Sequence, residues 1–125
     1  MRVLVIDDES DVEMLFRQKF RREIKAQTID FDFALSAEEA LTYLKSPTAQ
    51  AEITLILSDI NMPGMNGLEL LRVIKEHYPE LNVFMVTAYG DERSEQTALA
   101  YGASGFLNKP VNFNQLKQDI LRLAS

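Results

Sequence analysis

The sequence has no cysteine and a single histidine, His77. The absence of cysteine excludes disulfide frameworks, cysteine-ligated zinc sites and thiol nucleophiles. A lone histidine does not make a metal site, and its place near the predicted end of a helix suits a cation at the helix dipole. Long apolar runs are also lacking. The first apolar run, Val3–Ile6, is too short for the core of a signal peptide. No apolar run in the sequence approaches the roughly 18 residues of a membrane span. We therefore expect a cytoplasmic protein with no membrane segment.

Positive charge is scarce as well, since 13 Lys and Arg residues face 19 Asp and Glu residues, a net charge of -6. An acidic balance argues against direct nucleic-acid binding. One stretch departs from it, with only Glu23 set against five basic residues: Arg17, Lys19, Arg21, Arg22 and Lys25. Either a solvated helix face or a docking surface for an acidic partner fits this stretch, and the sequence leaves both open.

Length and composition bound the organisation of the chain. Its 125 residues, 46% apolar and 26% charged, suit one globular domain over residues 1–125. The sequence contains no internal repeat, low-complexity segment or linker that would divide it. We expect the domain to end where the sequence ends.

Short apolar runs alternate with helical patterns along the whole chain. The predicted strands are Val3–Ile6, Thr28–Phe33, Ile53–Leu57, Asn82–Val86 and Gly105–Leu107. A helical stripe follows each of them, and Val12, Phe16, Phe20 and Ile24 predict one helix over residues 12–24. Five such strand–helix units predict an α/β protein with a five-stranded parallel sheet, covered by helices on both faces and joined by right-handed crossovers.

Cap residues predict where the other helices begin and end. Ser36 and Glu39 form an S-x-x-E capping box at the start of the second helix. Gly102 is expected to end the fourth helix in the left-handed conformation. The remaining boundary signals are Ser46-Pro47-Thr48 as a helix end, Pro79 as a stop, Asp91 as a cap, and Asn112 with Gln115 as a capping pair.

Polar side chains sit where four of the predicted strands end. Asp7 and Asp8 follow the first strand, Asp59 the third, Thr87 the fourth and Lys109 the fifth. In a parallel sheet the carboxyl ends of the strands meet at one edge, which is where ligands bind in such folds. We therefore expect three carboxylates, one hydroxyl and one ammonium to gather there.

The charges of this predicted cluster suggest which chemistry it supports. Two carboxylates about 4 Å apart repel by roughly 1–4 kcal/mol, depending on the effective dielectric constant. A hard divalent cation such as Mg²⁺ relieves that repulsion, because it prefers oxygen ligands. Lys109 adds a positive charge, so the set resembles a phosphoryl-transfer site in which an aspartate can be the nucleophile and form an acyl phosphate.

Other phosphate or nucleotide chemistries fit less well. A haloacid-dehalogenase-like phosphatase needs Asp-x-Asp after the first strand, whereas this chain has Asp7-Asp8-Glu9. A dinucleotide or flavodoxin-like cofactor site needs a glycine-rich first turn, and residues 7–12 contain no glycine.

Taken in order, these motifs resemble the receiver domain of two-component response regulators. They are Val5-Ile6-Asp7-Asp8-Glu9, Leu57-Ser58-Asp59-Ile60-Asn61-Met62-Pro63 with Gly67, Val86-Thr87-Ala88, and Lys109-Pro110. The resemblance covers residues 2–124, and residues 58–67 are especially close to the single-domain chemotaxis-type regulators. It implies the flavodoxin-like receiver fold, a doubly wound five-stranded parallel sheet flanked by five helices.

The resemblance assigns roles to the acidic residues. Asp59 matches the phosphoacceptor and a ligand of Mg²⁺. Asp8 matches the direct metal ligand, and Asp7 the carboxylate that reaches the metal through water. Asn61 matches the position whose backbone carbonyl completes the coordination, and it flanks the expected path of attacking water together with Tyr89.

The remaining positions concern the phosphoryl group and the response to it. Lys109 matches the lysine that contacts the phosphoryl group, and its bond to Pro110 is expected to be cis. Thr87 matches the hydroxyl that moves to the phosphoryl oxygens. Phe106 matches the switch aromatic, and as Phe it lacks the hydroxyl of the Tyr often found there. Tyr89 fits either a shield of the phosphoryl group or an ordinary loop or docking aromatic.

By resemblance, the chain is a phosphoacceptor that takes a phosphoryl group from a sensor histidine kinase, a phosphotransfer protein or a small phosphodonor. It promotes its own phosphorylation and dephosphorylation without being an enzyme in the ordinary sense. Its fourth helix, fifth strand and fifth helix form a switch surface, read by an output domain or a target protein or used for a phosphorylation-dependent homodimer. A phosphorylation-independent pseudo-receiver is the alternative, although such modules usually lose a key residue and none is missing here. Whether the chain stands alone or is cut from a longer protein stays open.

Overall fold

The computed structural model describes residues 1–88 and 91–124, without the side chain of residue 124. The strands are β1 (Arg2–Ile6), β2 (Asp30–Ala34), β3 (Ile53–Asp59), β4 (Val83–Ala88) and β5 (Gly105–Lys109). The helices are α1 (Asp11–Lys19), α2 (Arg21–Lys25), α3 (Ala37–Leu44), α4 (Pro47–Glu52), α5 (Gly67–His77), α6 (Glu92–Ala100) and α7 (Phe113–Ala124). None of the helices in these described ranges is long and apolar enough to cross a membrane.

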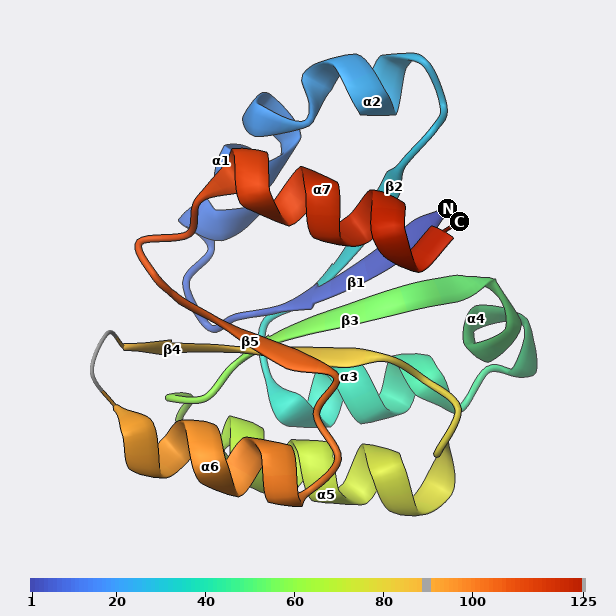
Figure 1. The fold of residues 1–125 in the computed structure, drawn as a ribbon. Coiled ribbons are helices and arrows are strands. Elements are labelled where there is room, and N and C mark those ends of the chain that lie inside the picture. Colours follow the sequence, from blue (N-terminus) through green and yellow to red (C-terminus); the bar gives the residue numbers. More distant parts are fainter. Residues whose placement is uncertain (89–90, 125) are drawn as a thin grey trace.

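The five strands form one parallel sheet in the order β2-β1-β3-β4-β5. Helices α1 and α7 cover one face of this sheet, and α3, α5 and α6 cover the other (Figure 1). The predicted doubly wound α/β architecture is therefore confirmed. Strands β1, β3 and β4 are central, so their carboxyl ends are flanked by neighbours on both sides.

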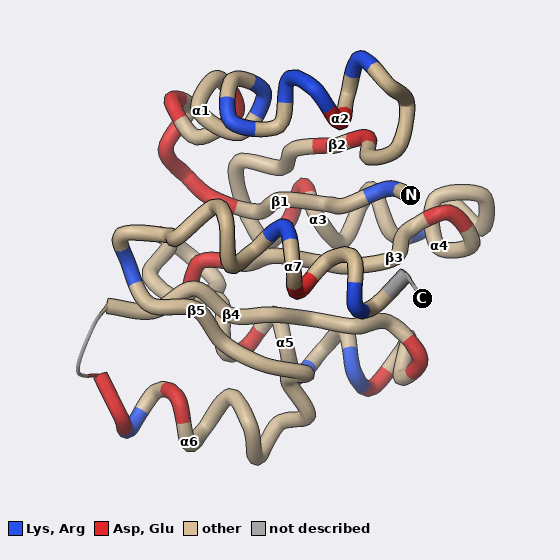
Figure 2. Tube along the Cα trace, turned by 45° about the horizontal axis from the view of Figure 1, so that its top comes forward, with Lys and Arg blue, Asp and Glu red and all other residues tan. Residues whose placement is uncertain are grey.

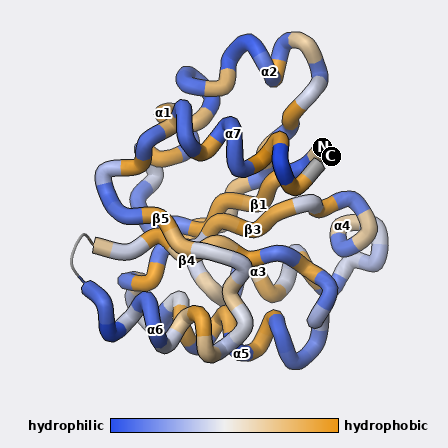
Figure 3. The backbone as a smooth tube through the Cα atoms, in the orientation of Figure 1, coloured by the Kyte–Doolittle hydropathy of each residue, from blue (hydrophilic) through white to orange (hydrophobic). Residues whose placement is uncertain are grey.

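Apolar side chains of the central strands form a core on each face, and Figure 3 shows β1 and β3 as largely hydrophobic. On the α1 and α7 side, Val3 and Leu57 pack with Phe16, Phe20 and Leu116. The other core consists of buried residues that include Leu4, Ile6, Ile56, Leu70, Leu71, Ile74 and Met85. Burial on both faces explains why β1 and β3 read as continuous apolar runs.

The predicted single helix over residues 12–24 is wrong in one respect, because it is two segments that meet at Phe20. The backbone there departs from helical values, with φ -106° and ψ 21°, and α2 continues in a new direction (Figure 1). The Phe20 ring is fully buried and makes edge contacts with Phe31 and Phe113. Core packing at Phe20 therefore overrides a straight helix, which periodicity alone does not reveal.

The second correction concerns Ser46-Pro47-Thr48, which was expected only to end a helix. It also begins α4, because Pro47 occupies the first helical turn and the Ser46 hydroxyl accepts a hydrogen bond from the backbone N–H of Ala49 at 3.4 Å. Proline suits this position because its missing N–H has no partner within a helix. The described chain thus holds seven helices instead of five.

The other predicted caps are confirmed. Ser36 accepts from the Glu39 N–H at 3.1 Å and Asn112 from the Gln115 N–H at 3.1 Å. Asp91 accepts from the N–H of Ser94 at 3.3 Å, and Gly102 has a φ of 99°. Strands β3, β4 and β5 extend past their predicted ends, so that Asp59, Thr87 and Lys109 belong to the strands themselves.

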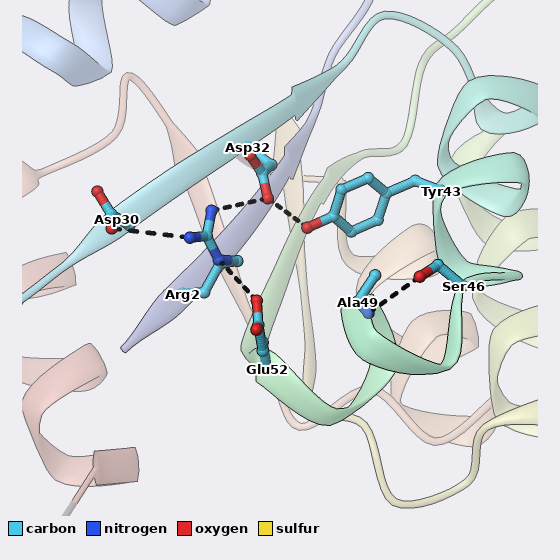
Figure 4. Close-up of polar contacts among 7 residues, drawn as sticks. All are labelled: Arg2, Asp30, Asp32, Tyr43, Ser46, Ala49 and Glu52. Carbon is cyan, nitrogen blue, oxygen red and sulfur yellow. Dashed lines mark hydrogen bonds and ion pairs between the residues drawn. The ribbon is translucent and has the colours of Figure 1, made fainter.

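The amino-terminal ends of the strands carry a polar cluster of their own (Figure 4). Arg2 in β1 pairs with Asp30 at 3.7 Å, Asp32 at 3.0 Å and Glu52 at 3.5 Å. The hydroxyl of Tyr43 in α3 donates to Asp32. One guanidinium therefore connects β1 with β2 and with the end of α4, at the opposite edge from the polar strand ends.

Candidate functional site

Three carboxylates meet at the carboxyl ends of β1 and β3. Asp59 is the last residue of β3 and is only 3% exposed, whereas Asp7 is half-buried and Asp8 exposed in the loop after β1. One oxygen from each of the three carboxylates lies within 4.8 Å of the others. The prediction that the parallel sheet brings these residues together is confirmed.

Lys109 completes the cluster from the end of β5, the edge strand beyond β4. Its Nζ atom donates to Asp59 Oδ2 at 3.0 Å, although β5 and β3 are separated by β4. The Lys109–Pro110 peptide bond is cis, as predicted. Asp59 is thus enclosed by protein, and the ammonium group of Lys109 reaches it from a partly exposed side chain.

Burial and the charges in this cluster shift two pKa values. Burial raises the pKa of Asp7 and the negative charge of Asp59 adds to it, against the lowering effects of the Glu9 N–H and of Lys109. Burial alone would lower the pKa of Lys109. The hydrogen bond and charge of Asp59, with the charges of Asp7 and Glu9, outweigh that effect, so the pKa of Lys109 lies above its ordinary value. Lys109 therefore keeps its positive charge at neutral pH.

The start of α5 fixes the backbone around Asp59. Asn61 donates its backbone N–H to Asp59 Oδ1 at 3.3 Å, and Gly67 donates its N–H to the Ile60 carbonyl at 2.8 Å. A Cβ atom at Gly67 would lie 2.1 Å from the backbone oxygen of Asp59. Asn66 caps α5 by accepting from the Glu69 N–H at 2.9 Å. The sequence analysis includes Gly67 in the receiver-like motif but does not reveal this close approach.

Thr87 lies in β4 with 1% exposure, and its hydroxyl contacts a residue that sequence reasoning missed. The amide nitrogen of Asn108 donates to Thr87 Oγ1 at 3.0 Å and to Glu95 Oε1 at 2.8 Å. The only signal for Asn108 in the sequence is an amide directly before Lys109 at the end of an apolar strand. Glu95 carries no such signal, because its role depends on how α6 packs.

Of the two aromatic residues singled out in the sequence, Phe106 and Tyr89, the structure describes Phe106. Phe106 in β5 is half-buried and packs against the core on the α3, α5 and α6 side. Its predicted rotation stays a prediction. Tyr89, for which the sequence left open a shield of the phosphoryl group or an ordinary loop or docking aromatic, lies outside the described residues.

An apolar cavity opens beside the acidic cluster. Its volume is about 510 Å³, and Asp7, Asp59 and Lys109 border it. Its walls come from β1, α1, the loop after β5 and the start of α7, and include Val5, Val12, Leu15, Phe16, Val111 and Phe113. The cluster therefore has an open, largely apolar approach on the side of α1.

The donor set of this site fits a hard divalent cation. Carboxylate oxygens are the ligands that Mg²⁺ prefers, and it commonly uses one or two of them beside waters and phosphate oxygens. Asp7, Asp8 and Asp59 could hold such an ion, since their oxygens lie close enough to share it. An enclosed carboxylate beside a cation site and an ammonium is an arrangement suited to phosphoryl transfer, where positive groups neutralise the charge on the transferred group.

Comparison with known proteins agrees with this chemistry. The family model for the response regulator receiver domain matches residues 3–121. Response regulator protein PilR of Pseudomonas aeruginosa is 32% identical over 117 residues, which cover 94% of this chain and 24% of PilR. A CheY homolog of Campylobacter jejuni, named a chemotaxis protein, is 29% identical over 122 residues, covering 96% of this chain and 89% of the homolog. The chain thus spans about a quarter of PilR and most of the CheY homolog.

Solved structures show the same fold. A response regulator receiver domain protein from Clostridium thermocellum superposes with a TM-score of 0.85 at 28% identity, covering 98% of this chain and 92% of that one. Response regulator protein TrrA from Thermotoga maritima, in complex with Mg²⁺ and BeF, gives a TM-score of 0.77 at 31% identity, covering 98% and 97%.

Proposed function

This chain belongs to the family of response regulator receiver domains, and from that membership we propose that Asp59 takes up a phosphoryl group from a sensor histidine kinase or a phosphotransfer protein. We further propose that residues 1–125 make up one such domain. The observation that carries the proposal is the enclosed Asp59 carboxylate, with Lys109 Nζ at 3.0 Å and two further carboxylates beside it.

The transfer step follows from the residues around Asp59. A carboxylate oxygen of Asp59 attacks the phosphorus of a phosphohistidine, and the new O–P bond forms as the P–N bond breaks. The bonding electron pair stays on the imidazole nitrogen, which takes a proton from water. The product is an acyl phosphate on Asp59. Lys109 moves from pairing with the carboxylate to neutralising the phosphoryl oxygens.

Asp7, Asp8, Asp59 and the backbone carbonyl of Asn61 would hold Mg²⁺ at this site. When bound, the ion supplies positive charge beside the phosphoryl oxygens and relieves the repulsion among the carboxylates. This assignment is supported by the three carboxylates, whose oxygens lie within 4.8 Å of one another. The chain's own part is to hold the carboxylates in place and keep Lys109 protonated.

The response begins with the added charge. Phosphorylation replaces a monoanion by a nearly dianionic group with three acceptor oxygens. The Thr87 hydroxyl moves toward it, Phe106 turns inward, and the surface of α6, β5 and α7 changes. This is a shift between two existing states, so its size depends on how differently they bind the phosphoryl group. An output domain, a target protein or a second copy of the chain reads that surface.

The test is to incubate the protein with Mg²⁺ and acetyl phosphate and measure its intact mass. Wild type should gain one phosphoryl group, and Asp59→Asn should gain none. Asp11→Asn, the same exchange at an exposed position of α1, should behave as wild type. An unmodified wild type would leave the pseudo-receiver alternative, and an undiminished gain in Asp59→Asn would reject Asp59 as the acceptor.

A further inference from the structure

Asn108 forms a bridge between Thr87 and α6. Thr87 and Asn108 are direct partners in the pairing of β4 with β5. The Asn108 amide nitrogen lies 3.0 Å from Thr87 Oγ1 and 2.8 Å from Glu95 Oε1, in the first half of α6. Two strands and a helix are therefore connected through one side chain.

Every donor in this bridge is in use. An amide nitrogen carries two hydrogens, and Asn108 gives one to each of its two acceptors. The Thr87 hydroxyl has one hydrogen, which it donates to the Ala88 carbonyl at 3.3 Å while its oxygen accepts from Asn108. The bond from Asn108 to the Glu95 carboxyl group ties the bridge to α6.

The bridge lies on one face of the sheet. Side chains alternate along a strand, so Thr87 shares a face with Met85, and Asn108 shares a face with Phe106. Met85 belongs to the core on the α3, α5 and α6 side, and Phe106 packs against that core. The hydroxyl of Thr87 is thus held toward α6.

We propose that Asn108 is a positioning residue, which holds the Thr87 hydroxyl on the α6 side before phosphorylation and, through Glu95, ties that position to α6. The inference rests on the proposed function and adds to it. It assigns a restraint on the switch to two residues outside the acidic cluster.

The direction of the effect follows from the hydrogen bonds. Phosphoryl oxygens only accept, so Thr87 must withdraw its hydrogen from the Ala88 carbonyl to reach them. As the hydroxyl leaves, one N–H of Asn108 loses its acceptor in a partly buried place, which opposes the movement. Removing the amide should therefore favour the phosphorylated arrangement and loosen α6 before phosphorylation.

The test measures the affinity of the full chain for beryllium fluoride, a phosphoryl mimic, at saturating Mg²⁺, by calorimetry. Asn108→Val keeps a strand-forming side chain and should bind the mimic about three- to tenfold more tightly, as expected for the loss of one opposing hydrogen bond. In a Thr87→Val background the same change should give no further tightening. Amide hydrogen exchange over residues 92–100 should be faster in Asn108→Val without the mimic.

One control and one second variant keep the outcomes separate. Ser104→Ala removes the hydrogen bond to Asn82 beside the other end of β5, at 3.1 Å, and should leave the affinity unchanged. Glu95→Leu should also tighten binding, and it decides the matter if Asn108→Val does not fold. Unchanged or weaker binding in these variants overturns the inference alone. A wild type that binds the mimic no better than Asp59→Asn overturns the proposed function as well.

Discussion

At Asp7, burial and the charge of Asp59 act in the same direction, and both disfavour the ionised carboxylate. Lys109 offsets this only in part, because its ammonium lies against Asp59 at 3.0 Å. The Asp7 carboxylate of the metal-free protein therefore carries an electrostatic penalty. Because this penalty belongs to one side chain, substituting Asp7 alone should change the free energy of unfolding.

Asp7→Asn should stabilise the metal-free protein at neutral pH by about 1 kcal/mol, because it removes a charge whose folded-state pKa is raised. Asparagine keeps the oxygen that accepts the Glu9 N–H at 2.9 Å. Since a raised carboxyl pKa destabilises the fold only where the group is ionised, the difference should shrink as the pH falls toward the ordinary value of 3.8. Urea unfolding with a chelator present measures it.

The same variant should gain less stability from added Mg²⁺ than wild type does, because it has one charged ligand fewer. Glu80→Gln, an exposed acid at the opposite edge of the sheet, is the matched control and should respond to Mg²⁺ as wild type does. A metal-free Asp7→Asn that unfolds more easily than wild type would argue against a strained carboxylate cluster.

Tyr43 offers a second pH test, remote from the site. Burial, followed by the hydrogen bond and charge of Asp32, raises the pKa of Tyr43 to about 12. Its contribution to stability should be fully present below about pH 10 and lost as the pH rises through 12. Tyr43→Phe should lower the unfolding free energy by about 1 to 2 kcal/mol at neutral pH, with a smaller deficit in strong base.

Absorbance titration of tyrosinate in wild type and Tyr43→Phe would show directly whether a late-titrating group is lost. Tyr101→Phe, at a 41% exposed position, serves as the control. Equal titration curves above pH 11 for wild type and Tyr43→Phe, apart from total amplitude, would contradict the assignment to Tyr43.

At the scale of elements, the sequence predicts the strands well and the helix details less well. Buried strands such as Ile53–Asp59 read as apolar runs because both faces are covered. An apolar stripe does not reveal a bend such as the one at Phe20, and a Ser-Pro pair can begin a helix as readily as end one. The rule that the carboxyl ends of parallel strands meet at one edge correctly predicted that Asp59 and Lys109 lie together. It did not find the Asn108–Glu95 bond, which depends on how α6 packs on β5.

The junction of β3 and α5 depends on one glycine. Gly67→Ala should lower the unfolding free energy by about 3 kcal/mol or more, because its Cβ would lie 2.1 Å from the Asp59 backbone oxygen. The shift of Asp59 should also weaken stabilisation by Mg²⁺. Gly105→Ala is the control, since its nearest contact is the Phe84 ring at 3.2 Å, which can move. Equal losses in urea unfolding for both variants would contradict the backbone clash.

At the scale of the whole molecule, charge is unevenly spread. The net charge is -6, yet basic residues gather along α1 and α2 (Figure 2). Arg17 pairs with Glu13 at 3.0 Å and lies over the Phe33 ring at 5.1 Å, so part of this run is structural. Arg21, Arg22 and Lys25 are exposed. The structure therefore leaves a basic surface that fits either solvent or an acidic partner.

Replacing Arg21, Arg22 and Lys25 by Gln should leave the unfolding free energy within about 0.5 kcal/mol of wild type. If this surface docks an acidic kinase, phosphoryl transfer from the kinase should slow by about tenfold at low salt, and less at high salt. The matched control neutralises three exposed cations elsewhere, Lys45, Arg72 and Arg93. Equal transfer rates for both triple variants would assign the surface to solvent.

If the enclosed carboxylate of Asp59 becomes an acyl phosphate, the phosphoryl group can be mapped to that one residue. The protein would be phosphorylated with Mg²⁺ and acetyl phosphate, digested at low pH and sequenced by mass spectrometry. The phosphoryl group is expected on Asp59, in the peptide that holds the end of β3, and should be lost on treatment with hydroxylamine. A stable phosphate on a serine, a threonine or His77, or a group on another aspartate, would contradict this assignment.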